Sequence, residues 1–183
     1  MRTSVWISSV VAMVWACSGA ANAQEARTIY LQGGTGEHNA YAATVGVTLP
    51  WAPSWSWGLG SGVVRGQWDA YVSNWSSRPE DAARRNTVWL GVGPSVRWRG
   101  DGGKSPWFVE AGTGVSFANR YYRSGTDQFG SRYSFASHIG VGRNFGAQGE
   151  HELSLRVQHS SNAGLKEPNP GENFLLLRYA HAF

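Results

Sequence analysis

Residues 173–183 read NFLLLRYAHAF, and apolar or aromatic side chains recur there at every second position. Successive side chains of a β-strand point to opposite faces, whereas those of a helix repeat about every 3.6 residues. The spacing therefore predicts a strand with one apolar face. The residues that share this face are Leu175, Leu177, Tyr179, His181 and Phe183.

The two-residue period recurs along most of the chain, while a helical period is almost absent. In residues 107–117, for example, Trp107, Val109 and Val115 alternate with small or polar residues. The parity changes near Val63, which predicts a bulge there. The expected strands are residues 28–33, 41–51, 55–75, 88–98, 107–117, 133–145, 153–161 and 173–183.

Eight such strands, each apolar on one face and small or polar on the other, predict an all-β fold, an eight-stranded antiparallel transmembrane β-barrel. Phenylalanine at the end of an alternating strand resembles the C-terminal signature of outer-membrane barrels. Glycines suit a narrow lumen, and strand-end aromatics such as Trp51, Trp98, Trp107 and Tyr133 are expected in the interfacial girdles. The competing architecture is a soluble sandwich or lipocalin-like barrel, in which the aromatic face would point inward.

Charged residues at inward positions are expected to fill the lumen as paired groups rather than to line an open pore. They are Arg97, Glu110, Arg156 and Arg178. Basic residues in expected extracellular loops are interpreted as solvated charge, with lipid phosphates as the alternative partner. They are Arg84, Arg85, Arg120 and Arg123. The formal net charge is only +4 and the sequence contains no run of basic residues, so nucleic acid is excluded as a partner.

The N-terminus has the organisation of a secretory signal peptide. Residues 1–23 combine Arg2, a mostly apolar segment and a small-x-small sequence that ends at Ala23. We expect cleavage after Ala23, which leaves residues 24–183 as one barrel domain without cysteine. The alternative is a lipoprotein anchored through Cys17. Without a cysteine, the mature chain has no thiol chemistry and no cysteine-ligated metal.

Polar residues interrupt the apolar face of the strand expected at residues 153–161. The parity of Leu155 and Val157 continues to His159 and Ser161, whose side chains must therefore point the same way. A histidine beside a serine is the minimum for a base-activated nucleophile, and small residues after the serine could supply oxyanion donors. The spacing alone leaves open a pair of interfacial residues with no catalytic task.

The segment QHSSNAGLK at residues 158–166, followed by PNPGEN at 168–173, resembles the lipid A 3-O-deacylase family. The resemblance implies an outer-membrane enzyme that hydrolyses the ester joining a 3-hydroxyacyl chain to position 3 of lipid A in lipopolysaccharide. It implies Ser161 as nucleophile, His159 as general base and Glu172 as the acid that orients the histidine, with Glu167 as the alternative acid. Oxyanion stabilisation would come from Asn162, Ala163 and Gly164.

The resemblance implies neither a metal nor an organic cofactor. The expected partners are the lipopolysaccharide substrate and the outer membrane, and a homodimer is left open. Because outer-membrane barrels end in the periplasm, the strand carrying His159 and Ser161 should finish on the extracellular side, where lipid A lies. The alternatives are a non-catalytic barrel serving as an adhesin or anchor, and acyl transfer to another lipid.

Overall fold

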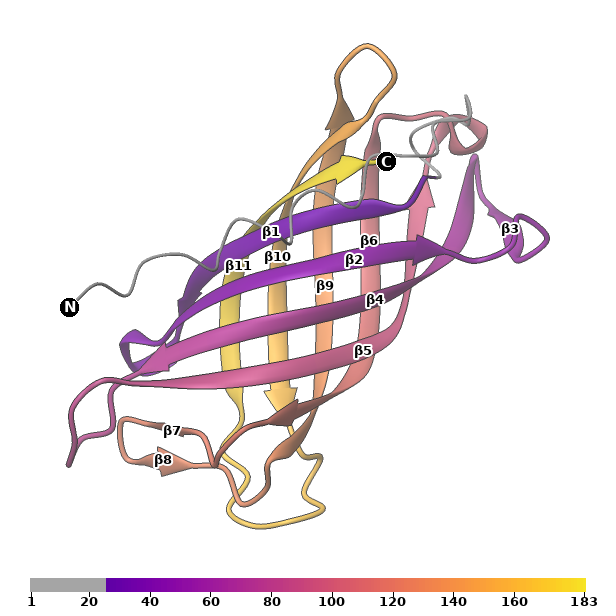
Figure 1. Ribbon diagram of the computed structural model, residues 1–183. Helices are drawn as coiled ribbons and strands as arrows, with labels where there is room; N and C mark the ends of the chain where they lie inside the picture. The colour runs from indigo at the N-terminus through magenta and orange to yellow at the C-terminus, as the bar shows by residue number, and fades with distance from the viewer. Residues whose placement is uncertain (1–25) are drawn as a thin grey trace, which may run out of the picture.

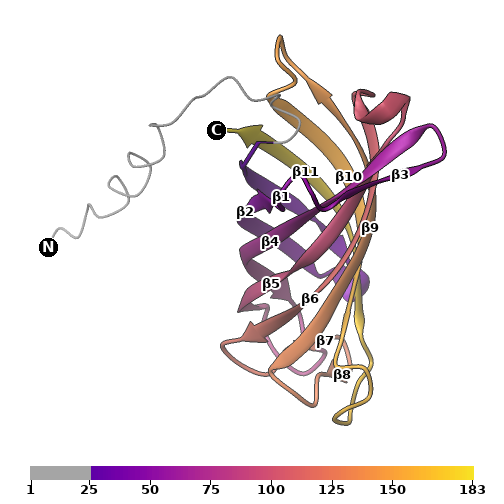
Figure 2. The same cartoon turned by 90° about the vertical axis from the view of Figure 1, so that its right-hand side faces the viewer.

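The computed structural model describes residues 26–183; the predicted signal peptide and Cys17 lie outside the described residues. The chain forms a closed antiparallel β-barrel (Figures 1 and 2). Its long strands are β1 (Thr28–Gly36), β2 (Tyr41–Pro50), β4 (Gly62–Ser77), β5 (Arg85–Arg99), β6 (Trp107–Ala118), β9 (Tyr133–Phe145), β10 (His151–Ser161) and β11 (Glu172–Ala182). The neighbour order β2-β1-β11-β10-β9-β6-β5-β4 is closed by pairing between β2 and β4. The predicted fold is confirmed.

Short strands and 3-10 turns lie at both ends of the barrel. Strand β3 (Ser56–Leu59) and the 3-10 turn η4 (Asp101–Gly103) lie at the end that carries the C-terminus (Figure 1). The opposite end carries the 3-10 turn η3 (Glu37–Asn39), strands β7 (Arg123–Ser124) and β8 (Asp127–Gln128), and the loop before β11. In outer-membrane barrels the longer loops are extracellular, so we refer to this second end as the extracellular end.

The prediction of one bulged strand over residues 55–75 is wrong. The chain reverses at Gly60, whose φ of 61° lies in the left-handed region, and β3 pairs back onto β4. The register between β4 and β5 is continuous from Val63 to Ser77, which leaves no extra residue for a bulge. The apparent change of parity arises because this turn separates two strands: the exposed apolar residues have odd numbers in β3 (Trp57, Leu59) and even numbers in β4 (Trp68, Val72).

A band of exposed aliphatic side chains surrounds the barrel. In water this continuous apolar surface would be unfavourable, whereas it matches the hydrocarbon core of a bilayer. Each long strand contributes at least one member, for example Leu31, Val45, Val72, Leu90, Val109, Ile139, Leu155 and Leu177. Within residues 26–183, no helix is long and apolar enough to cross a membrane.

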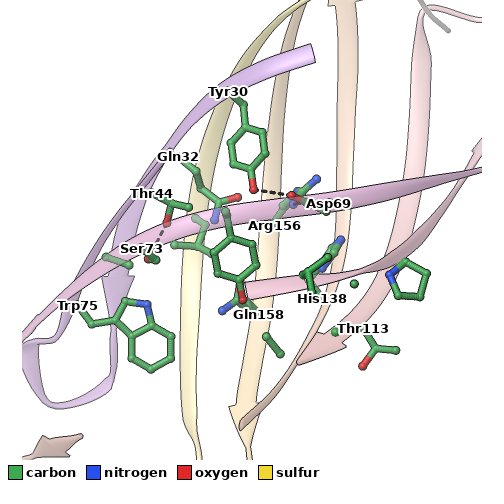
Figure 3. A pocket seen from close by; sticks show the side chains of 18 residues that line it. Tyr30, Gln32, Thr44, Asp69, Ser73, Trp75, Thr113, His138, Arg156 and Gln158 are labelled. Carbon is green, nitrogen blue, oxygen red and sulfur yellow. Dashed lines mark hydrogen bonds and ion pairs between the residues drawn. The ribbon is translucent and has the colours of Figure 1, made fainter. Parts of the chain in front are cut away.

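The lumen is filled by a buried network of hydrogen bonds and ion pairs (Figure 3). The Tyr30 hydroxyl donates to Asp69 at 2.6 Å, and Arg178 donates to the same carboxylate at 3.1 Å. Nearer the periplasmic end, Arg97 bridges Glu110 at 2.8 Å and Glu152 at 2.6 Å. The remaining cavity at the middle of the barrel is about 30 Å³. The predicted lumen of paired charges is confirmed.

At the extracellular end an aromatic plug replaces the ion pairs inside the barrel. The rings of Trp75 and Trp89 are 4.6 Å apart between centroids, and Phe174 approaches Trp75 equally closely. Tyr122 and Phe129, from the segment between β6 and β9, complete the plug. Trp75 and Trp89 therefore lie inside the barrel, apart from the strand-end aromatics expected in the membrane girdles, because both side chains occupy inward positions of their strands.

Candidate active site on the lipid-facing side of β10

His159 and Ser161 lie on the outer face of β10, in line with the apolar residues Leu155 and Val157. His159 is exposed and Ser161 is half-buried. The strand ends at Ser161, at the extracellular end of the barrel (Figure 1). The pair therefore stands at the rim of the apolar band, where a polar group can meet both lipid and water.

The residue opposite His159 in the neighbouring strand is Asn173. The β10–β11 register pairs these two residues, and Nδ1 of His159 lies 2.8 Å from Oδ1 of Asn173. Gly171 makes room for the imidazole ring, because a Cβ at this position would lie 2.8 Å from Cε1 of His159. The side-chain amide of Asn173 is thus the group that can orient His159.

The structure does not bring Glu172 to His159. Neighbouring residues of a strand face opposite sides, so the Glu172 side chain points into the barrel, where it is 2% exposed. The Tyr122 hydroxyl donates to its carboxylate at 2.9 Å. The alternative acid, Glu167, instead accepts a hydrogen bond from the backbone N–H of Asn169 at 3.0 Å. The assignment of either glutamate as the direct partner of His159 is corrected by this geometry.

A sequence signal for Asn173 existed. It has the parity of Leu175 in β11, which is the lipid-facing parity, and a hairpin between β10 and β11 places it beside His159. The expectation of a carboxylate as the third group led instead to Glu172, at the neighbouring position. Parity was the better guide, because it holds up to the first residue of the strand.

Asn162 serves as a scaffold for the loop that follows Ser161. Its side chain is fully buried, and its amide nitrogen donates to the carbonyl of Lys166 at 2.6 Å and to Oγ of Ser131 at 3.2 Å. Its backbone N–H donates to Oδ1 of Asn169 at 2.8 Å. With both amide hydrogens engaged, the side chain fixes the loop and is not directed at a substrate. The prediction of its amide as an oxyanion donor is not supported by this geometry.

Ala163 and Gly164 form a tight turn immediately after Ser161. Their φ angles are 55° and 74°, and the N–H of Leu165 donates to the carbonyl of Asn162 at 3.1 Å, as in a type I′ turn. This turn hydrogen bond does not use the N–H groups of Ala163 and Gly164. Two backbone donors therefore follow the candidate nucleophile within three residues, and groups of this kind are those from which an oxyanion hole is built.

Two adjoining hollows with basic linings lie at the extracellular end. The first, of about 390 Å³, includes Phe117, Tyr133 and Lys166, and the second is about 500 Å³. Tyr121 and Arg132 line both. The second hollow also contains Arg85, Arg120 and Arg123. Among residues 26–183, no group of three or more histidine, cysteine or acidic side chains is arranged to hold a metal ion.

Comparison with known proteins identifies related sequences. The family model described as "Lipid A 3-O-deacylase (PagL)" matches residues 39–182. A "Lipid A deacylase PagL" of Pseudomonas aeruginosa is 34% identical over 151 residues, which cover 82% of this chain and 83% of the relative. A second protein of that name, from Bordetella bronchiseptica, is 38% identical over 82 residues, covering 42% of this chain and 41% of that protein.

Solved structures agree. The fold superposes on the crystal structure described as the outer membrane enzyme PagL with a TM-score of 0.72 and 26% identity, covering 85% of this chain and 99% of the other. A de novo designed transmembrane β-barrel matches with a TM-score of 0.51 at 10% identity, covering 87% and 96% of the two chains. The second likeness concerns the fold alone.

Proposed function

This chain belongs to the lipid A 3-O-deacylase family (PagL) and is an outer-membrane β-barrel hydrolase, and we propose that it removes the 3-O-linked acyl chain of lipid A by serine catalysis at Ser161. The observation that carries the proposal is the hydrogen bond between His159 and Asn173 on the lipid-facing side, two residues from Ser161 on the same face of β10. Serine, histidine and an orienting group are the parts of a base-activated nucleophile.

The proposed reaction proceeds in two halves. His159 accepts the hydroxyl proton as Oγ of Ser161 attacks the ester carbonyl, and the backbone N–H groups of Ala163 and Gly164 stabilise the resulting oxyanion. The bond between the acyl carbon and the 3-oxygen of the sugar then breaks, and His159 gives the proton to this departing oxygen, which becomes the free 3-hydroxyl group. Water activated by His159 hydrolyses the acyl-serine, which releases a 3-hydroxy fatty acid and regenerates Ser161.

The position of the site suits a substrate that never leaves the membrane. Lipid A occupies the outer leaflet, and its ester bonds lie near the boundary between acyl chains and head group. Ser161 is at the same boundary, since it follows the apolar part of β10 and precedes an exposed loop. A lipid-facing nucleophile is thereby explained without passage of the substrate through the filled lumen.

The basic hollows are suited to the phosphorylated sugar of lipid A. Guanidinium groups bind phosphate oxygens through paired, charge-assisted hydrogen bonds. Lys166 is five residues after Ser161 and shares the first hollow with Arg132 and Tyr133. We therefore propose that the basic residues of these hollows bind the phosphate groups of lipid A, rather than serving only as solvated loop charge.

The test is the mass of lipid A from bacteria that express either the wild type or the Ser161→Ala variant. Wild type should remove one 3-hydroxyacyl group, and the variant should leave lipid A intact while its barrel inserts normally. Heat-dependent gel mobility verifies folding of both proteins. Intact lipid A with a well-folded wild type, as expected for an adhesin or anchor, contradicts the proposal. A newly acylated lipid in place of a released fatty acid would identify an acyltransferase.

A further inference from the structure

We propose that Glu37 is a positioning residue of this site, which acts through Asn173 to hold His159 in the tautomer that can accept a proton at Nε2. The inference rests on the proposed serine mechanism. It adds a carboxylate from a different part of the barrel, since Glu37 belongs to η3, between β1 and β2.

Barrel closure brings Glu37 to the site. Strand β1 pairs with β11 on the side opposite β10, and the last pair of this register is Gly36 with Phe174. The turn that follows β1 therefore lies against the start of β11. There Nδ2 of Asn173 donates to Oε1 of Glu37 at 3.1 Å, and the backbone N–H of Asn173 donates to Oε2 at 3.4 Å. One carboxylate thus receives two hydrogen bonds from one residue.

This contact determines which end of the Asn173 amide faces the histidine. A carboxylate only accepts hydrogen bonds, so the NH₂ end of the amide must face Glu37. The carbonyl end, Oδ1, is then turned toward His159, at 2.8 Å from Nδ1. Because Oδ1 also only accepts, Nδ1 of His159 must carry the hydrogen in this bond.

A neutral imidazole with its hydrogen on Nδ1 has a lone pair on Nε2. That nitrogen is the one able to take the proton of Ser161, and a histidine held in the other tautomer loses this capacity. Without Glu37, the amide of Asn173 could turn over and present its NH₂ end to Nδ1. The negative charge of Glu37 also favours the imidazolium that forms during the attack.

The first measurement is steady-state hydrolysis of lipopolysaccharide in detergent by Glu37→Leu and Glu37→Gln. Glu37→Leu should lower kcat roughly tenfold with little change in KM, as is typical when a hydrogen-bonding group that orients a functional histidine is removed. Glu37→Gln should cost less, because its carbonyl end can still accept from Asn173. The matched control is Glu80→Gln, which removes a charge from another extracellular loop and should keep the wild-type kcat.

A rescue experiment separates positioning from a merely structural role. In the Asn173→Asp background a carboxylate faces His159 directly, and Glu37→Gln then supplies an amide donor to it. Removal of the Glu37 charge should therefore lower kcat in the wild-type background and leave it equal or raise it in the Asn173→Asp background. An equal loss in both backgrounds, or wild-type kcat in Glu37→Leu, overturns the inference.

Ser161→Ala, assayed in parallel, distinguishes this inference from the proposed function. If Ser161→Ala retains turnover, the serine mechanism itself fails. If Ser161→Ala is inactive while Glu37→Leu behaves as the wild type, the mechanism stands and only the role of Glu37 is refuted.

Discussion

Glu172 and Asn173 are consecutive residues of β11, yet they belong to two polar networks on opposite sides of the barrel wall. Glu172 faces inward and accepts a hydrogen bond from Tyr122 of the aromatic plug. Asn173 faces outward and connects His159 to Glu37. The difference follows from the alternation of a strand, which assigns one residue to the packed interior and the next to the membrane side.

The two networks also differ in how firmly they are built. Inside, Asp69 accepts a hydrogen bond from Tyr30 and forms ion pairs with Arg156 and Arg178, and all four side chains are buried. Outside, Asn173 is the single link between His159 and Glu37, and all three side chains are exposed at the surface of the protein. The interior network fills the barrel, whereas the outer one, in the proposed mechanism, positions the reactive histidine. Under the proposed mechanism, the polar residues on the lipid-facing side, and not those in the lumen, mark the site of chemistry.

The largest expected effect comes from breaking the interior network. Glu110→Ala should remove a buried carboxylate from both Arg97 and Arg156, at a cost of about 3–5 kcal/mol in the free energy of unfolding. The kcat of the molecules that remain folded should change little, because Glu110 is remote from β10's extracellular end. Denaturant titration in detergent measures the first quantity and an activity assay below the transition measures the second. A large fall in kcat at unchanged stability would refute the separation of the networks.

An intermediate effect is expected from the adjacent pair in β11. Asn173→Leu, which keeps the branched shape and removes the amide, should lower kcat roughly 10- to 100-fold, or about 1.4–2.7 kcal/mol. Glu172→Gln, its neighbour on the inner face, should stay within about threefold of wild type, because the amide oxygen still accepts from Tyr122. Steady-state hydrolysis of lipopolysaccharide compares the two. The reverse order would return Glu172 to the catalytic machinery.

The smallest effect concerns the basic hollows. Arg132→Ser should raise KM by roughly three- to tenfold with kcat preserved, since a single partly solvated charge contributes about 1 kcal/mol. The rise should shrink with added salt and with a substrate that lacks phosphate groups. Arg78→Ser, at a basic loop residue outside the lining of both hollows, is the matched control. A KM unaffected by the Arg132 substitution would assign these arginines to solvent instead.

Much of this comparison could be predicted from the sequence, because strand alternation is a local property. The parity of residues 153–161 located His159 and Ser161 on one lipid-facing side, and the inward positions of Arg97 and Glu110 predicted their pairing. The same parity could have identified Asn173. It was missed because a carboxylate, rather than an amide, was expected beside the histidine.

Other features depend on contacts between distant parts of the chain. Glu37 reaches the site only because β1 pairs with β11 when the barrel closes, and no local pattern records that register. Trp75 and Trp89 form a plug because segments 119–132 and β11 bring Tyr122, Phe129 and Phe174 against them. The β3 hairpin is hard to recognise in the sequence because the change of parity across the Gly60 turn imitates a bulge within one strand.

The central claim, that Ser161 on the lipid-facing side is the nucleophile, is tested most directly by trapping the acyl-enzyme. Wild-type enzyme mixed with excess lipopolysaccharide is quenched in acid within the first turnovers, digested and analysed by mass spectrometry. The account predicts a 3-hydroxyacyl group on the peptide containing Ser161, absent from His159→Ala treated in the same way. Two results would contradict it: an acyl group found on another residue during turnover, or full activity of Ser161→Ala.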